Sequence, residues 1–107
     1  MVKSQSLPSI SIVVPSFNQA QFLDENLASI FSQDYPRLEV IVIDGGSTDH
    51  SLEIIKQWAP RLAYWQSQPD NGQSDAINQG MKRCTSDLIA WLNSDDFYWK
   101  DSLWAVG

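Results

Sequence analysis

The feature that most constrains the fold is the alternation of short apolar runs with segments of helical periodicity along the 107-residue chain. The apolar runs cover residues 10–14, which Pro15 is expected to close, and residues 38–43, 62–65 and 87–92. Short runs of β-branched and other apolar residues, without polar alternation, are typical of strands buried on both faces of a parallel sheet. We therefore predict four strands at these positions.

Apolar residues between these runs recur at the spacing of α-helices. The first predicted helix spans residues 19–33, and the second follows the capping sequence at residues 47–49 and is closed by Pro60. A third begins near residue 73 or 74, and Gly80 would let it approach the sheet closely. The order β-α-β-α-β-α-β, with short connections, predicts an α/β fold in which helices flank an open, mostly parallel sheet. The predicted apolar faces consist of Leu23, Leu27, Ile30 and Phe31, then Leu52, Ile55, Trp58 and Ala59, then Ala76, Ile77, Gly80 and Met81.

Five tryptophans add bulky side chains to a core that must be modest at this chain length. We expect Trp58, Trp65 and Trp91 to pack against other apolar residues rather than to stack against sugars. One more helix is expected to begin near Asp101.

Composition excludes several classes of function. Seven Lys and Arg residues against 13 Asp and Glu give a net charge of −6, which argues against nucleic acid as a partner because that surface needs basic residues. The single cysteine, Cys84, and the single histidine, His50, exclude a disulfide framework, a multi-cysteine zinc site and a histidine-rich metal centre. Residues 1–9 lack the apolar region of a signal peptide, so we expect a cytoplasmic protein, which missing sequence could attach to the inner face of the membrane.

Ligands of open α/β sheets bind beyond the carboxyl ends of the strands, near the point where the strand order reverses. The residues after the first strand contain neither a G-x-G-x-x-G turn nor a P-loop, which excludes two common classes of nucleotide-binding protein. Acids follow two other strands: Asp44 comes after the second, and the pair Asp95 and Asp96 comes after the fourth. Such a pair could hold Mg²⁺ or Mn²⁺ together with ligand phosphates, or it could only cap the next turn. Its position after an apolar strand favours the metal site.

Three motifs in order carry a resemblance to a known family. They are residues 12–18 (IVVPSFN), 42–49 (VIDGGSTD) and 91–96 (WLNSDD), with residues 70–78 (DNGQSDAIN) between the last two. In order and spacing, these motifs resemble those of glycosyltransferase family 2, over nearly the whole chain from Ile10 to about Tyr98. The resemblance implies the GT-A fold, which is Rossmann-like, and a nucleotide-diphospho-sugar donor.

The resemblance also implies roles for particular residues. The acids after the fourth strand would bind a divalent cation, Mn²⁺ or Mg²⁺, with Asp96 as the direct metal ligand and Asp95 reaching the ribose or the ion. The other nucleotide-sugar-binding residues implied in this way are Pro15, Ser16, Phe17, Asn18, Asp44, Gly45, Asp75 and Asn93.

The sequence departs from the commonest family pattern at three positions, two of which are among these residues. Many members have a second acid, often the one that contacts the base, where this chain has Gly45, and Asp44 could substitute for it. Gly45 is itself expected to allow a turn with positive φ or a close approach of the base. Asn93 stands in place of the leading acid of the metal motif, and Ile77 stands where many members carry an arginine, part of whose polar role Asp75 could fill.

As a whole, the chain resembles the N-terminal nucleotide-sugar-binding part of a transferase, over residues 1–107, without the acceptor-binding half. The implied activity is inverting, metal-assisted sugar transfer, as in polysaccharide biosynthesis, from a UDP-, GDP- or dTDP-sugar to a hydroxyl of a saccharide or lipid-linked acceptor. The catalytic base is expected beyond residue 107, so the chain alone should bind the donor without turnover. Two alternatives are a non-catalytic nucleotide-binding fragment and a structural α/β domain whose Asp pair only caps a turn.

Overall fold

The computed structural model describes residues 8–92, in which strands and helices alternate as the sequence predicts. The predicted α/β fold and its β-α-β-α-β-α-β order are confirmed. The elements are β1 (Ile10–Ser16), α1 (Ala20–Phe31), β2 (Leu38–Asp44), α2 (Ser51–Trp58), the 3-10 turn η2 (Ala59–Arg61), β3 (Tyr64–Ser67), α3 (Gln73–Met81) and β4 (Leu88–Trp91). The helix expected near Asp101 lies outside the described residues.

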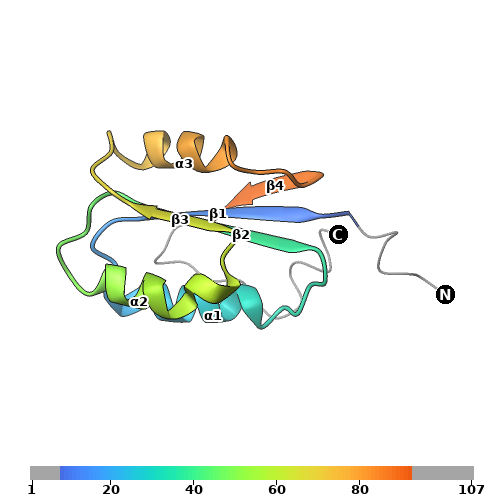
Figure 1. Cartoon of the computed structure of the whole chain (residues 1–107), viewed down its shortest axis with the longest axis horizontal. Coiled ribbons are helices and arrows are strands. Elements are labelled where there is room, and N and C mark those ends of the chain that lie inside the picture. Colours follow the sequence, from blue (N-terminus) through green and yellow to red (C-terminus); the bar gives the residue numbers. More distant parts are fainter. Residues whose placement is uncertain (1–7, 93–107) are drawn as a thin grey trace.

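The four strands form one parallel sheet with the order β3-β2-β1-β4. The chain first moves outward from β1 through β2 to β3, and then returns to pair β4 with the other side of β1. Helices α1 and α2 cover one face of the sheet, and α3 covers the opposite face (Figure 1). This change of face is what a right-handed crossover requires once the direction of strand addition reverses. The strand order therefore reverses between β1 and β4.

The core has two halves, one on each face of the sheet. On the side of α1 and α2, Ile12 and Val14 pack with Leu23, Leu27 and Ile55. On the side of α3, the buried cluster consists of Val13, Ile41, Ile43 and Ala76. Because adjacent residues of β1 enter different halves, this strand is buried along its whole length, as its uninterrupted apolar run predicts.

Pro15 does not close β1, which continues to Ser16. The backbone N–H of Leu92 donates to Val13 O, and that of Gly45 donates to Ser16 O, so alternate residues of β1 face β4 and β2. The nitrogen of Pro15 therefore lies on the β4 side, beyond Val13 and Trp91, which are the last described pair of these two strands. The missing N–H of proline removes no hydrogen bond to β2, so the strand continues.

The third strand begins two residues later than predicted, at Tyr64 instead of position 62. The 3-10 turn after α2, which contains Pro60, lengthens the connection. After this turn Ala63 lies beside β2, and the N–H of Ala63 donates to Val40 O. The paired residues of the two strands then run from Ile41 with Tyr64 to Asp44 with Ser67. Tyr64 and Ser67 are therefore the ends of the strand.

Packing of the tryptophans was predicted correctly for Trp58 and Trp65 but wrongly for Trp91. The Trp58 ring stacks on Phe31 with 5.4 Å between centroids, and its Nε1–H donates to Asp24 at 2.8 Å. Trp65 packs against the core on the α1 and α2 side. Trp91 is 46% exposed because β4 is an edge strand within the described sheet, so only β1 covers its flank.

The close approach predicted at Gly80 is confirmed. A Cβ atom added to Gly80 would overlap Cγ1 of Val13 and lie 3.0 Å from Cγ2. Helix α3 therefore packs on β1 at a distance that leaves no room for a side chain at this position.

Glu39 fastens the loop before β4 to the sheet. Its carboxylate accepts hydrogen bonds from Ser11 Oγ at 2.6 Å, from Thr85 N at 3.1 Å and from Thr85 Oγ1 at 3.0 Å. Partial burial raises the pKa of Glu39, but these hydrogen bonds together hold it below the ordinary value of 4.5. Nearby, partial burial raises the pKa of the Cys84 thiol, which is consistent with a small packed residue and not with a reactive one.

We expect Glu39→Gln to lower the free energy of unfolding by about 1 kcal/mol at pH 7, since it removes a charged acceptor. Because the pKa of Glu39 is lower in the folded state, its contribution is present above pH 4.5 and is lost as the pH falls through the folded pKa. Urea unfolding of both proteins at several pH values between 7 and 3 measures this. The difference should shrink below pH 4.5, whereas a difference that is constant with pH would contradict the assignment; Glu25→Gln, on the exposed side of α1, is the control.

Candidate functional site

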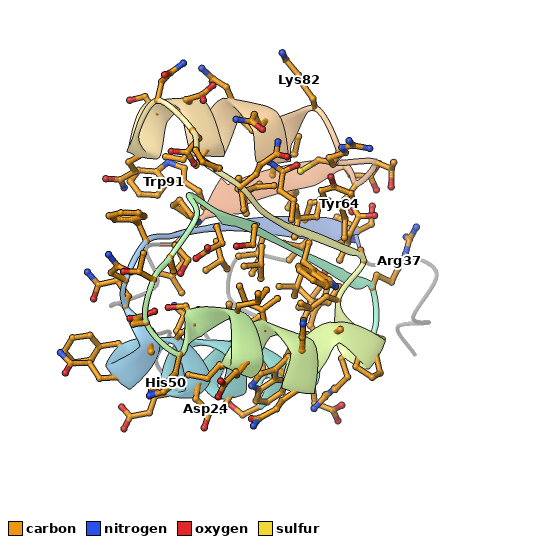
Figure 2. All side chains as sticks on the ribbon, turned by 60° about the vertical axis from the view of Figure 1, so that its left-hand side comes forward. Asp24, Arg37, His50, Tyr64, Lys82 and Trp91 are labelled. Atoms are coloured by element: carbon orange, nitrogen blue, oxygen red, sulfur yellow. The ribbon has the colours of Figure 1, made fainter. Side chains whose placement is uncertain are left out.

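The carboxyl ends of β1, β2 and β3 meet in one row at the edge of the sheet. Ser16 pairs with Asp44, and Asp44 pairs with Ser67, so these three residues lie in register. In Figure 2, His50 and Trp91 lie toward this end of the molecule and Arg37 lies toward the opposite end. Since the strand order reverses between β1 and β4, this is the edge at which an open α/β sheet binds its ligand.

Asp44 is fully buried at the centre of this row. Its Oδ2 accepts hydrogen bonds from Gly46 N at 3.2 Å, from Ser47 N at 2.8 Å and from Ser67 Oγ at 2.8 Å. Its Oδ1 accepts one from Ser47 Oγ at 2.6 Å. The carboxylate therefore holds the loop after β2 against the end of β3, and it does not reach the surface where a ligand could contact it.

The loops after β1 and β2 are fastened together by a reciprocal clasp. Asn18 N–H donates to Ser47 Oγ at 2.8 Å, and Asn18 Oδ1 accepts from Thr48 N at 2.8 Å. Asn18 has a φ of 52°, in the left-handed region that asparagine tolerates better than most residues. The amide oxygen of Asn18 therefore helps to position the two loops.

Asp49 joins the same loops to the two helices that follow them. Its Oδ2 accepts from Ala20 N, in the first turn of α1, at 3.1 Å, and its Oδ1 accepts from Ser51 N, in α2, at 2.9 Å. Slight burial raises the pKa of Asp49, but the hydrogen bonds from Ser51 and Ala20 lower it below its ordinary value. The predicted capping by this segment is thus right in kind, although the N-cap position itself is His50.

We expect Asn18→Ala to lower the free energy of unfolding by about 1.5 kcal/mol, because it loses the hydrogen bond to Thr48 and places alanine at positive φ. Asn18→Gly keeps the backbone conformation but loses the same bond, so it should cost less than Asn18→Ala. Thermal and urea unfolding of the two variants separate the two effects. Equal stability of Asn18→Ala and the unmodified chain would show that the clasp contributes nothing.

The two glycines after Asp44 serve different purposes, and the positive φ expected at Gly45 is at Gly46 instead. Gly46 has a φ of 85°, whereas the φ of Gly45 is not in the left-handed region. The loop after β3 crosses directly over both: a Cβ on Gly46 would lie 3.1 Å from Pro69 N, and one on Gly45 would lie 3.1 Å from both carboxylate oxygens of Asp70. Gly46 therefore makes the turn, and Gly45 allows the close approach of Asp70.

Asp75 follows this loop, in the first turn of α3, and one of its carboxylate oxygens is used within the protein. Its Oδ2 accepts from Asn71 N at 2.9 Å and from Gln79 Nε2 at 3.0 Å.

Phe17, by contrast, is 56% exposed after the end of β1, with its ring available to a ligand. Among the predicted site residues, the structure brings together Pro15, Ser16, Phe17, Asn18, Asp44, Gly45 and Asp75 at the carboxyl edge or in the loops above it.

The predicted metal ligands Asp95 and Asp96, and the neighbouring Asn93, lie outside the described residues. Within residues 8–92, no group of three His, Cys, Asp or Glu side chains is arranged to hold a metal ion. Strand β4 nevertheless runs parallel to β1, toward the edge at which Ser16 lies, and its last described pair joins Trp91 to Val13. No helix in the described part of the chain is long and apolar enough to cross a membrane.

Sequence reasoning missed the residues that hold the loops in place. The register of Ser67 with Asp44 could have been found only once the start of β3 was known, and the partners of Asn18 follow from the arrangement of two loops in space. Asp70 gave one usable signal: a glycine at position 45, where the resemblance implies an acid, leaves space for another side chain. The missed residues are Ser67 and Asp70, and for Ser47, Thr48 and Asp49, which were predicted only as a capping segment, the missed feature is their role in joining the loops.

Comparison with known sequences gives a family that covers most of the chain. The sequence profile of Glycosyl transferase family 2 matches residues 11–105. A glycosyltransferase of Mycobacterium tuberculosis (strain CDC 1551) is 42% identical over 92 residues, which are 85% of this chain and 35% of that protein. The putative teichuronic acid biosynthesis glycosyltransferase TuaG of Bacillus subtilis is 29% identical over 90% of this chain and 39% of its own length. The chain thus spans about a third of the length of the curated relatives it matches.

Solved structures agree with the sequence comparison. The mannosyltransferase PcManGT from Pyrobaculum calidifontis, in complex with GDP-Man and Mn²⁺, has a TM-score of 0.82 and 30% identity, covering 92% of this chain and 30% of that one. S. aureus TarS, in complex with UDP-GlcNAc, has a TM-score of 0.82 and 27% identity over the same shares of the two chains. The neighbours have the GT-A fold, which confirms the predicted architecture.

Proposed function

The chain belongs to glycosyl transferase family 2, and on that premise we propose that it binds a nucleotide-diphospho-sugar and supports transfer of the sugar, with inversion, to an acceptor hydroxyl. The acceptor would be a saccharide or a lipid-linked molecule, and the donor a UDP-, GDP- or dTDP-sugar. GDP-Man and UDP-GlcNAc, which two structural neighbours bind, support this class of donor. The name of TuaG supports a role in polysaccharide biosynthesis.

The observation that carries the proposal is the pair of fixed loops at the carboxyl edge. Asp44, Asn18 and Asp49 hold these loops through hydrogen bonds within the protein, before any ligand is present. A site that is already ordered loses little conformational entropy on binding, so its contacts contribute more fully to affinity. The exposed ring of Phe17 offers a flat apolar surface along which the base and ribose can lie.

In this proposal Asp95 and Asp96, which follow β4 in the sequence, hold Mn²⁺ or Mg²⁺, and Asn93 contributes to binding of the nucleotide-sugar. The ion would neutralise the negative charge that develops on the departing diphosphate. Mn²⁺ in the PcManGT complex supports the choice of cation. Pro15 and Ser16, at the end of the neighbouring β1, would bring the backbone close to the same nucleotide.

The chain matches only part of the length of its relatives, and this suggests which parts of the reaction its residues would perform. We place the catalytic base and the acceptor site in the length of the family proteins that the chain does not cover, so that residues 1–107 form the donor-binding part. A cytoplasmic location is part of the proposal. The alternative, a nucleotide-binding fragment that never supports transfer, differs only in whether an acceptor-binding part completes it.

Isothermal titration of the purified chain with UDP and GDP, with and without Mn²⁺, tests the proposal. We expect at least one nucleotide to bind in a metal-dependent manner, and Asp96→Ala to weaken that binding at least about tenfold. Glu25→Ala, in an exposed part of α1, is the control and should bind as the unmodified chain does. Unchanged affinity of Asp96→Ala would remove the metal assignment, and absence of all nucleotide binding would remove the proposed function.

A further inference from the structure

Asp70 has a carboxylate oxygen that the protein does not use. Its Oδ1 accepts a hydrogen bond from Gly72 N at 2.9 Å, which shapes the turn before α3. Within residues 8–92, Oδ2 has no hydrogen bond or ion pair, and the residue is only partly buried. The hydrogen bond to Oδ1 fixes the orientation of the carboxylate group. Oδ2 is therefore held in a defined position and can accept a hydrogen bond from a ligand.

The position of this carboxylate relates it to the ends of β1 and β2. Both oxygens lie 3.1 Å from the place that a Cβ of Gly45 would occupy. Gly45 is itself fixed to β1, because its N–H donates to Ser16 O at 2.8 Å. Asp70 thus brings a carboxylate to the edge at which the donor is proposed to bind, from a loop that follows a different strand.

The other acids of this edge also accept hydrogen bonds from the protein, and Asp44 and Asp49 do so through both carboxylate oxygens. Asp44 is buried with four hydrogen bonds, Asp49 accepts from the first turns of two helices, and Asp75 accepts from Asn71 and Gln79. Asp75 also keeps one oxygen, Oδ1, without a hydrogen bond within residues 8–92, so what distinguishes Asp70 is that its carboxylate, with one oxygen still available, lies beside Gly45. The empty space at Gly45 is what admits it.

We propose that Asp70 selects the base of the donor nucleotide by accepting a hydrogen bond from the ring N–H of uracil, thymine or guanine. This inference rests on the proposed function and deepens it. A carboxylate only accepts hydrogen bonds at neutral pH. Uracil and thymine present N3–H, and guanine presents N1–H, whereas cytosine N3 and adenine N1 are acceptors and would face the carboxylate with a lone pair. The chain would therefore bind uridine, thymidine or guanosine diphosphates in preference to cytidine or adenosine diphosphates.

Matched nucleotide pairs test this selection, because UDP and CDP, like GDP and ADP, carry the same ribose and phosphates. In the presence of Mn²⁺ we expect the chain to prefer UDP over CDP, or GDP over ADP, by at least about tenfold. Asp70→Asn should reduce that preference to within about threefold, because an amide can donate as well as accept. Asn keeps an acceptor for Gly72 N–H, so the thermal midpoint should change little. Asp70→Ser, whose hydroxyl can also accept from the turn, is a second variant if Asp70→Asn folds poorly.

Asp87→Asn is the matched control, because Asp87 also accepts one backbone N–H, from Ser9, but lies at the start of β4 at the other end of the sheet. It should retain the preference of the unmodified chain. If Asp70→Asn weakens UDP and CDP equally, the carboxylate contacts the ribose or phosphates and the inference is wrong. An unchanged preference in both Asp70 variants also overturns it, while leaving the proposed function intact. If the unmodified chain binds none of the four nucleotides, both fail together.

Discussion

Asp44→Ala is expected to lower the free energy of unfolding by about 4 kcal/mol, measured by urea unfolding at pH 7. The substitution leaves four donors without their acceptor: the N–H groups of Gly46 and Ser47 and the hydroxyls of Ser47 and Ser67. Since Asp44 is fully buried, water does not reach these groups easily to replace the lost bonds. The loop after β2 should also lose its fixed conformation, so nucleotide binding should weaken with it.

Two further substitutions separate these effects. Ser67→Ala removes one of the four hydrogen bonds and should cost about 1 kcal/mol. Asp44→Asn keeps the shape but turns an amide group toward donors, so it should remain strongly destabilising. A loss of less than about 1 kcal/mol for Asp44→Ala would show that the carboxylate does not hold the loop.

Gly80→Ala is expected to destabilise the protein by about 2 kcal/mol, the opposite of what the substitution does in an ordinary helix. In an exposed helix interior, Gly→Ala stabilises by about 1 kcal/mol because alanine has the higher helix propensity. Here the added methyl group would overlap Cγ1 of Val13, so α3 must move away from the sheet. The cost of overpacking therefore exceeds the gain in propensity.

A double-mutant cycle with Val13 identifies the cause. In the Val13→Ala background the space beside Gly80 is larger, so Gly80→Ala should lose most of its cost. Asn78→Ala, at an exposed position of the same helix, is the control for helix propensity and should not destabilise. Stabilisation by Gly80→Ala in the unmodified background would contradict the close packing of α3 on β1.

The fold was predictable because its signals are local. The apolar runs at β1 and β2 and the periodicity of Leu23, Leu27 and Ile30 are visible in the sequence, and their residues are buried as expected except at the start of β2, where Leu38 is only partly buried. Two small residues one helical turn apart, Ala76 and Gly80, also predicted that α3 approaches the sheet closely. The errors concern Pro15, the start of β3 and Trp91. The first two depend on which neighbouring strand a backbone group faces, and the exposure of Trp91 depends on what covers the edge of the sheet.

The candidate site was predictable in location but not in the division of roles. The ends of β1 and β2 were assigned to the site from their motifs, and the structure brings them together. Sequence alone does not show that Asp44 accepts a hydrogen bond from Ser67 or that Asn18 accepts one from Thr48, because these partners lie in segments that are distant in the sequence. For the same reason it did not show that Asp70 fills the space beside Gly45.

Hydrogen exchange of the chain, measured by mass spectrometry with and without UDP or GDP and Mn²⁺, tests the central claim that the carboxyl edge of the sheet binds the donor nucleotide. Residues 15–18, 44–49 and 67–72 should exchange more slowly when the nucleotide is bound, because these segments form that edge. Exchange at the opposite edge, where Phe31, Asp34, Tyr35, Leu38 and Arg61 line a pocket, should not change. Protection confined to that pocket, or no protection in the three segments at saturating nucleotide, would contradict the account.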